Sequence, residues 1–255
     1  MSDPDQKEDE DMKSIVWKRF NQFLFVVLAV TITASIGAAQ VNSTQKQKDI
    51  NDARKTASQA ANVFNQIMRA PDRSIPRDLL DKAEAVAIFP GVVNAAFIFG
   101  GRGGVGLISR RTSTGWSGPA FFKLGGGSFG AQIGGQKIDY IMLIMNDRGL
   151  EGLLKDKFEI GGEASVAAGP VGRSASATTN ATLDAAILSY SRARGLFAGV
   201  ALKGAVISPD NDKNQAVYRH NAAEILRLKS TDLPIPDYAN IVPQTLTQYS
   251  GRKGN

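Results

Sequence analysis

Cysteine is absent from this chain of 255 residues, and histidine occurs once. Without cysteine the chain has no disulfide scaffold, no cysteine-ligated zinc site and no thiol nucleophile. A single imidazole also excludes any site that needs two histidines. Charged residues make up 21% of the chain and hydrophobic residues 43%, which is ordinary globular composition. This length and composition predict one domain, at most two, with a hydrophobic core.

Residues 1–39 carry the pattern of an export signal. Acidic residues fill the first positions, basic residues follow, and an apolar run of 17 residues ends the segment. That run is shorter than the ~20 residues that a membrane-spanning helix needs, and Gly37 and Ala39 fit the small residues before a cleavage site. We expect a secretory signal peptide over residues 1–39, with the native start at Met12. An uncleaved N-terminal anchor is the alternative.

The net charge of +6 indicates the kind of partner. Without residues 1–39 the chain keeps 26 basic and 18 acidic residues. A basic protein that crosses a membrane meets anionic lipid headgroups or anionic polymers rather than nucleic acid. We therefore expect an exported protein of the periplasm or outer envelope, with peripheral membrane association and no nucleic-acid partner.

The next segment, residues 40–84, is predicted to be helical. Apolar residues recur at spacings of three and four over residues 43–70, and a short helix follows near Pro76. The long helix either packs on the domain or lies on a membrane as a basic amphipathic helix. Its apolar face is rich in alanine and weakly hydrophobic, which favours packing. The residues that would contact a membrane are Lys46, Lys48, Arg54 and Lys55.

Residues 85–229 predict a sheet domain that ends in a helix. Of the 26 glycines, 23 lie between residues 91 and 204, where glycine clusters alternate with short apolar runs. Glycine within strands allows the bends and bulges that curve a sheet. We expect an α+β fold with a curved, mostly antiparallel, glycine-rich sheet or partial barrel, flanked by N- and C-terminal helices. We expect one helix to interrupt the sheet, with Asn146 or Asp147 as its capping residue.

Residues 230–255 are expected to form a C-terminal extension. Three prolines, Pro234, Pro236 and Pro243, predict an extended connection over residues 230–243.

Two short motifs fail on their context. Residues 101–106 match GxGxxG, but the apolar residues after them continue a strand where the dinucleotide fingerprint requires a helix. Asp210, Asp212 and Asn214 begin like a calcium loop that lacks its glycine and its last glutamate, so we interpret them as helix-capping residues. No Gly-Lys dipeptide exists for a phosphate-binding loop. We expect no cofactor and no metal.

The most serious enzyme candidate is a GxSxG motif at residues 126–130. Ser128, a later aspartate and His220 follow the chain order of an α/β-hydrolase. However, that nucleophile needs a helix after it, and residues 131–135 are a poor helix. We predict that the protein is not an enzyme and keep a serine hydrolase using Ser128 and His220 as an alternative.

Basic residues among the glycines predict an anion site. Residues 91–204 hold 12 basic and seven acidic residues. Glycine-rich turns expose backbone N–H groups, and arginine offers a fork of donors to phosphate oxygens. An ordinary solvated positive surface is the alternative. The candidate residues for a lipid phosphate are Lys123, Lys137, Arg173, Arg192, Arg194 and Lys203.

Three long blocks resemble the SYLF family of lipid-binding domains. They are FFKLGGGSFGAQIGGQKIDYIMLIMN, FEIGGEASVAAGPVGRSASA and ILSYSRARGLFAGVALKGAVI, in the same order as in the family. The resemblance implies an α+β domain with a curved antiparallel sheet and phospholipid binding, with phosphoinositides as ligands and actin as a further partner in eukaryotic members. It also implies membrane contact by the N-terminal helix and offers no catalytic residues.

The leading hypothesis is therefore a non-enzymatic protein of the bacterial envelope. It binds anionic phospholipid or a membrane surface through the basic sheet and the basic helix. Actin binding is not expected of an exported bacterial protein, and a protein partner is not identified. A structural protein that docks another envelope component is the alternative.

Overall fold

The computed structural model describes residues 43–70, 73–96, 100–128, 134–172, 184–227 and 233–250. Contacts divide the chain into residues 1–48 and residues 49–255, and the second unit contains the sheet. The signal expected over residues 1–39, with its start at Met12, lies outside the described residues. None of the helices within the described ranges combines the length and the apolar character that a membrane crossing requires.

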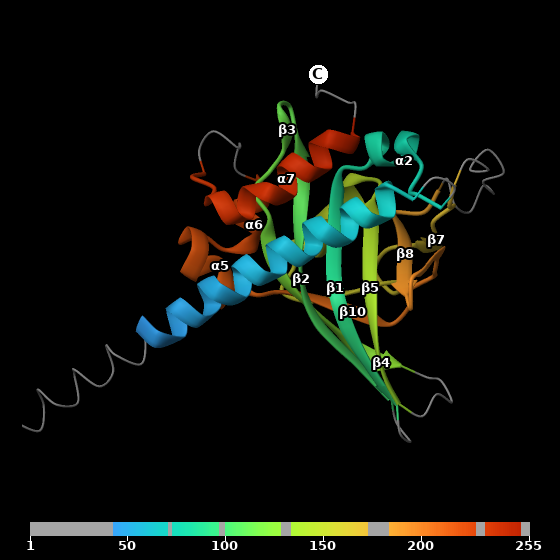
Figure 1. Ribbon diagram of the computed structural model, residues 1–255, viewed down its shortest axis with the longest axis horizontal. Coiled ribbons are helices and arrows are strands. Elements are labelled where there is room, and N and C mark those ends of the chain that lie inside the picture. The colour runs from blue at the N-terminus through green and yellow to red at the C-terminus, as the bar shows by residue number, and fades with distance from the viewer. Residues whose placement is uncertain are drawn as a thin grey trace, which may run out of the picture. The chain divides into compact units, whose positions relative to one another are not determined.

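Ten strands of the described residues form one curled sheet, a half-barrel (Figure 1). Their order is β6-β10-β4-β2-β1-β5-β8-β7, with β3 beside β2 and β9 beside β8. Among these ten strands only β7 and β8 pair in parallel, so the expected α+β fold with a mostly antiparallel curved sheet is confirmed. The strands are β1 (Ala85–Ala96), β2 (Gly100–Thr112), β3 (Gly115–Trp116), β4 (Ala120–Ser128), β5 (Gly134–Ile144), β6 (Phe158–Glu159), β7 (Val166–Ala168), β8 (Ile187–Ala193), β9 (Leu196–Gly199) and β10 (Ala205–Pro209).

Helices precede, interrupt and follow the sheet, as expected. The first spans residues 43–68, close to the predicted range. Asn146 begins the interrupting helix, because its side chain accepts a hydrogen bond from the Gly149 N–H at 3.0 Å. The further helices are α2 (Arg77–Lys82), α3 (Asp147–Leu153), α5 (Asn211–Tyr218), α6 (Ala222–Arg227) and α7 (Asp237–Tyr249).

The alanine-rich face of the first helix packs on the sheet (Figure 1). Ala53, Ala57, Ala60 and Phe64 are fully buried in the same core as the strands. Small side chains let the helix lie close to the sheet, so weak hydrophobicity does not prevent tight burial. The predicted packing of this helix on the domain is therefore observed from residue 53 onward.

The central strands are buried on both faces over part of their length. Leu107 and Ile108 are neighbours that point to opposite faces, and both are fully buried. The same holds for Phe121 and Phe122. This double burial explains the continuous apolar runs of the sequence, which lack the alternation of a half-exposed strand.

Helix α7 corrects the extended connection predicted for residues 230–243. The structure has a helix from Asp237 with Pro243 inside it. The proline ring removes one helical hydrogen bond, but Val242, Leu246 and Tyr249 are buried in the core. The Tyr249 hydroxyl also donates to Asn65 Oδ1 at 3.0 Å. Tertiary burial thus outweighs the local cost of the proline.

Candidate functional site

Part of the sheet lies beyond the helices and leaves one face uncovered (Figure 1). In the strand register Val105 lies opposite Lys123, and Gly103 lies opposite both Gly125 and Val93. Val93 in turn lies opposite Lys137. Because side chains alternate along a strand, these residues share one face. We call this surface the open face: Val93, Gly101, Gly103, Val105, Lys123, Gly125, Gly127 and Lys137.

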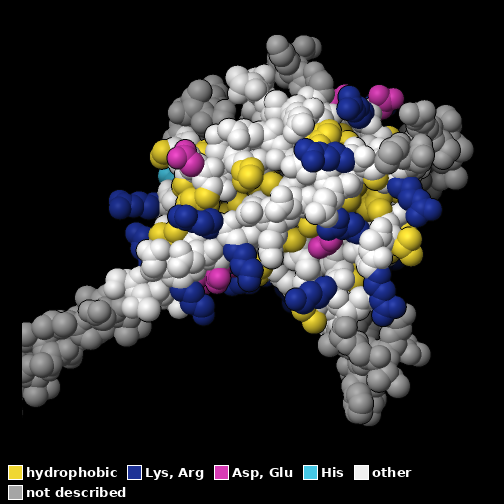
Figure 2. All heavy atoms as spheres, viewed as in Figure 1, with side chains coloured by type: hydrophobic (Ala, Val, Ile, Leu, Met, Phe, Trp, Pro, Cys, Tyr) yellow, Lys and Arg dark blue, Asp and Glu magenta, His cyan; other side chains and the backbone are white. Residues whose placement is uncertain are grey.

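The open face combines exposed apolar side chains with lysines. Val93 is 45% exposed and Val105 is 40% exposed, although both lie within strands of the sheet. The side chain of Lys123 is 53% exposed. Lys137 is exposed, and no described residue forms an ion pair or hydrogen bond with its side chain. Figure 2 shows dark blue and yellow side chains beside one another where the sheet extends past the helices.

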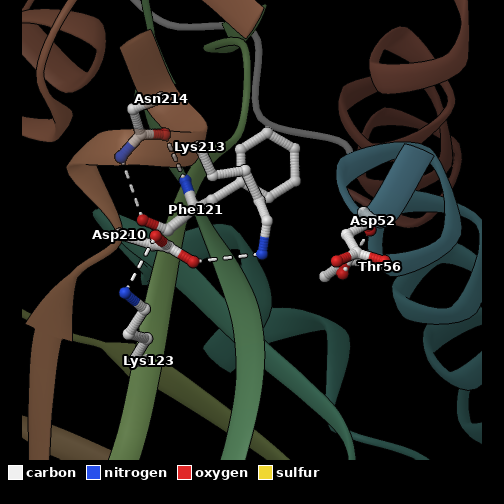
Figure 3. A network of polar contacts seen from close by, with 7 residues as sticks. All are labelled: Asp52, Thr56, Phe121, Lys123, Asp210, Lys213 and Asn214. Atoms are coloured by element: carbon white, nitrogen blue, oxygen red, sulfur yellow. Dashed lines mark hydrogen bonds and ion pairs between the residues drawn. The ribbon is translucent and has the colours of Figure 1, made fainter. Parts of the chain in front are cut away.

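Lys123 belongs to a network of ion pairs and hydrogen bonds at the start of α5 (Figure 3). Asp210 accepts contacts from Lys123 Nζ at 3.1 Å and from Lys213 Nζ at 3.0 Å, and it is 5% exposed. Burial opposes ionisation of Asp210, but the two ammonium groups outweigh it and hold the pKa of Asp210 below its ordinary value. Asn214 accepts from the Phe121 N–H at 2.7 Å and donates to its carbonyl at 3.0 Å. The network therefore fastens α5 to β4.

The capping role expected for Asp210 is only half correct. Asp210 stands at the N-cap position of α5, but its side chain makes no capping hydrogen bond. The carboxylate instead binds the two lysines, because a buried charge requires a partner.

Arg192 lies beside the open face and is bound within the protein. Its guanidinium makes two contacts with Asp139 Oδ2, at 2.9 and 2.7 Å, and donates a third hydrogen bond to Gln66 of the first helix. Asp139 also accepts from the Gly91 N–H at 2.8 Å. Arg192 thus joins β8, β5 and the helix, so its donors are used inside the fold.

The other predicted sheet residues lie at turns or outside the described residues. Arg194 occupies the turn between β8 and β9 with a φ of 49°, and Lys203 lies in the turn before β10 with its stem against Gly161. Within the described ranges neither has an ion-pair partner. Arg173 lies outside the described residues. Of the six predicted residues, the structure brings Lys123, Lys137 and Arg192 to one face of the sheet, where the guanidinium of Arg192 is bound to Asp139.

The four predicted helix residues have different surroundings in the structure. Lys46 and Lys48 are exposed and lie in the part of the helix that belongs to residues 1–48. The guanidinium of Arg54 lies 5.0 Å from the centre of the Tyr238 ring of α7, whereas Lys55 is exposed to solvent. Arg54 is therefore engaged in a cation–π contact within the domain.

The described backbone separates the end of β4, where Ser128 stands, from His220. Residues 126–128 end strand β4, and the next described element is strand β5 rather than a helix. His220 follows α5, whose Tyr218 ring lies 6.4 Å from that of Phe121. His220 therefore lies near the Phe121 end of β4, whereas Ser128 lies about 23 Å further along the strand at ~3.3 Å per residue. The Nδ1 atom of His220 instead lies 3.4 Å from Glu224 Oε2.

Sequence reasoning missed Val93 and Val105 because it selected for charge alone. A period-two alternation within residues 101–106 carried the missing signal, since Gly101, Gly103 and Val105 share one face of β2. The sequence gives no local pattern from which the partners of the basic residues could be predicted, because residues such as Arg192 and Asp139 are 53 positions apart.

The fold and the open face define an α+β protein built around a curled glycine-rich sheet with a basic, partly apolar surface. Comparison with known proteins gives the family. Residues 125–249 match the family model described as "Ysc84: Las17-binding protein actin regulator". The chain therefore carries a domain of the Ysc84/SYLF family, and the resemblance predicted from the sequence is confirmed.

Curated relatives cover different shares of the chain. LAS seventeen-binding protein 3 of Saccharomyces cerevisiae is 34% identical over 176 residues, which is 68% of this chain and 38% of the yeast protein. SH3 domain-containing YSC84-like protein 1 of Homo sapiens is 31% identical over 207 residues, 79% of this chain and 59% of the human protein. The chain thus spans less than two thirds of the length of these relatives. The family description names a Las17-binding actin regulator, and the yeast relative is named as a binding protein.

Proposed function

We propose that this protein binds anionic phospholipid surfaces through its open face and catalyses no reaction. One observation carries the proposal: two exposed valines and two lysines share a sheet face that the helices leave bare. An exposed apolar patch beside cations fits a partner with an anionic head and an apolar body.

The electrostatics of the open face support an anionic partner. Asp139 is paired with Arg192, and Asp210 is paired with Lys213 and Lys123. The carboxylates nearest the lysines are therefore compensated and repel an incoming phosphate little. Each lysine near an anionic membrane contributes about 1 kcal/mol, and this attraction decays within a Debye length. The valines add apolar contact that salt does not screen.

The envelope of a bacterium is the compartment that we propose for this activity. The leader pattern of residues 1–39 supports export, and the basic mature chain suits a peripheral position on an anionic membrane. The exposed side chain of Lys55 would add charge to the contact. Mass spectrometry of the native protein with its co-purifying lipids tests the processing and the lipid together.

Co-sedimentation with vesicles tests the lipid proposal. We expect the protein to bind phosphatidylglycerol vesicles more tightly than phosphatidylcholine vesicles, and the difference to shrink as salt rises. Lys137→Glu should weaken binding several-fold. The matched control is Arg148→Glu, which makes the same charge change in the first turn of α3, after the other end of β5.

Two results would contradict the proposal. Equal binding to neutral and anionic vesicles at every salt concentration would remove the electrostatic part. Equal losses in Lys137→Glu and Arg148→Glu would show that net charge matters and the open face does not.

A protein partner is the second candidate function, because the family description and the yeast relative's name refer to binding of another protein. A pull-down that yields one stoichiometric protein and retains no lipid would favour it. The same purified sample can be used for both assays.

A further inference from the structure

Glycines on the covered face of β2 are required by internal packing. A Cβ atom at Gly104 would lie 2.8 Å from Val92 Cγ2, and one at Gly106 would lie 2.4 Å from the Ile88 carbonyl oxygen. Neither distance is compatible with a side chain, since protein interiors are close-packed. A side chain at either position would therefore force the neighbouring strand β1 to shift.

Internal packing does not explain the glycines on the open face. Among the described residues, a Cβ atom at Gly101, Gly103 or Gly127 would meet no atom within 4 Å, and one at Gly125 would meet only a backbone oxygen at 3.9 Å. None of the four has a positive φ that disfavours other residues. Glycine weakens a strand because it gains no packing and loses more backbone entropy on folding. Packing among the described residues thus does not explain these glycines.

The four glycines form a compact patch on two neighbouring strands. Gly101 lies opposite Gly127, and Gly103 lies opposite Gly125. Val93 borders the patch on β1, since it pairs with Gly103. We call these four residues the glycine patch. Because these positions carry no side chain, a partner can come closer to the backbone there than it could to a strand of larger residues.

The chemistry of the patch indicates what approaches it. The backbone N–H and C=O groups of β2 and β4 pair with each other and with adjacent strands, so the patch offers few free polar groups. Val93 and Val105 add exposed hydrocarbon at its edge, and Lys123 and Lys137 supply positive charge. An apolar surface with flanking cations complements an anionic amphiphile.

We propose that the glycine patch receives the upper acyl chain of an anionic lipid while Lys137 holds its phosphate and Lys123, which is paired with Asp210, adds positive charge nearby. The inference rests on the proposed function, because it names the part of the open face that contacts the apolar body of the lipid. Bare backbone lets the chain lie against the sheet, and any side chain at Gly103 would displace it.

A size series at Gly103 tests this inference. Affinity for phosphatidylglycerol vesicles and the thermal unfolding midpoint are measured for the wild type and for Gly103→Ala, Gly103→Val and Gly103→Leu. We expect binding to weaken with side-chain size, by about tenfold for leucine, which corresponds to roughly two methylenes no longer buried. The unfolding midpoint should stay level or rise, because the position is open.

Two variants serve as controls. Gly162→Ala places a methyl group in the exposed turn after β6, where it makes only an ordinary 3.4 Å contact with Glu159, and vesicle binding should not change. Gly104→Ala should lower the unfolding midpoint, because its Cβ atom would meet Val92. Gly127→Val repeats the test at a second open position.

The outcomes separate the inference from the proposed function. If the wild type binds phosphatidylglycerol vesicles and the Gly103 series binds equally well, the patch inference is wrong and lipid binding stands. If the wild type does not bind these vesicles, both fail. A lower unfolding midpoint in both Gly103→Val and Gly127→Val would make the glycines structural and overturn the inference. Loss of a captured protein partner without loss of vesicle binding would assign the patch to that protein and also overturn it.

Discussion

Asp210→Asn is the sharpest test of how the open face is supported. The carboxylate of Asp210 is 3.0 Å from Lys213 Nζ, and both side chains are 7% exposed. Replacing the charge by an amide leaves the ammonium group of Lys213 buried without an opposite charge. Lys123 loses the same partner, but its side chain is 53% exposed and water compensates it.

The magnitude follows from burial. Removing one partner of a buried ion pair costs about 3–5 kcal/mol, whereas an exposed pair contributes less than about 1 kcal/mol. Asparagine still offers an oxygen to Lys213, so we expect a loss near the lower limit, about 3 kcal/mol of unfolding free energy at neutral pH. Urea titration followed by circular dichroism measures it, with the midpoint and the slope compared separately.

The pH dependence gives an independent signature. The pKa of Asp210 is held below its ordinary value, so its stabilisation is present above the unfolded pKa of about 3.9 and is lost as pH falls through the folded pKa. The wild type should therefore lose more stability than Asp210→Asn when the pH is lowered from 5 to 3. Parallel curves for the two proteins would refute the reasoning.

A double variant separates the buried charge from other effects. In Asp210→Asn with Lys213→Met the orphaned ammonium group is removed, and we expect most of the lost free energy to return. If the double variant is as unstable as Asp210→Asn alone, the buried lysine is not the cause of the loss.

Two further substitutions test single contacts by the same urea titration. Arg111 donates to the carbonyls of Ala83 and Leu80 and to Ser250 Oγ, and its guanidinium lies 4.1 Å from the centre of the Trp116 ring. Arg111→Lys should lower the free energy of unfolding by about 2–3 kcal/mol, because an ammonium group cannot make the same set of contacts. A loss below about 1 kcal/mol would contradict this role of Arg111. Arg194 has a φ of 49°, so Arg194→Gly should add about 0.5–1 kcal/mol, and any destabilisation would show that its side chain contributes to the fold.

Much of the fold could be predicted because its signals are local. The spacing of alanines indicated the first helix, Asn146 and Asp147 together indicated the start of α3, and glycine clusters between apolar runs indicated a curved sheet. Helix α7 was missed for the opposite reason. Pro243 argues against a helix locally, and only the burial of Val242 and Leu246 in the core reverses that preference.

For the candidate site, the sequence predicted the types of residue but not their arrangement. Basic residues among glycines indicated an anionic partner, but charge alone did not show which lysines share a face. Arg192 is bound to Asp139 and Gln66, which are distant in the sequence, and Arg54 is bound to Tyr238. Whether these arginines reach a lipid is still a prediction that vesicle binding can test.

The sequence by itself determined the family, the succession of helices and strands, and the excess of positive charge, because each depends on neighbouring residues or on composition. Only the tertiary structure decided which glycines stand against a neighbouring strand and which face open space. Strand register sets that difference, since Gly103 and Gly104 are adjacent in the chain but lie on opposite faces of the sheet. Register depends on contacts between distant segments, and no local pattern specifies it.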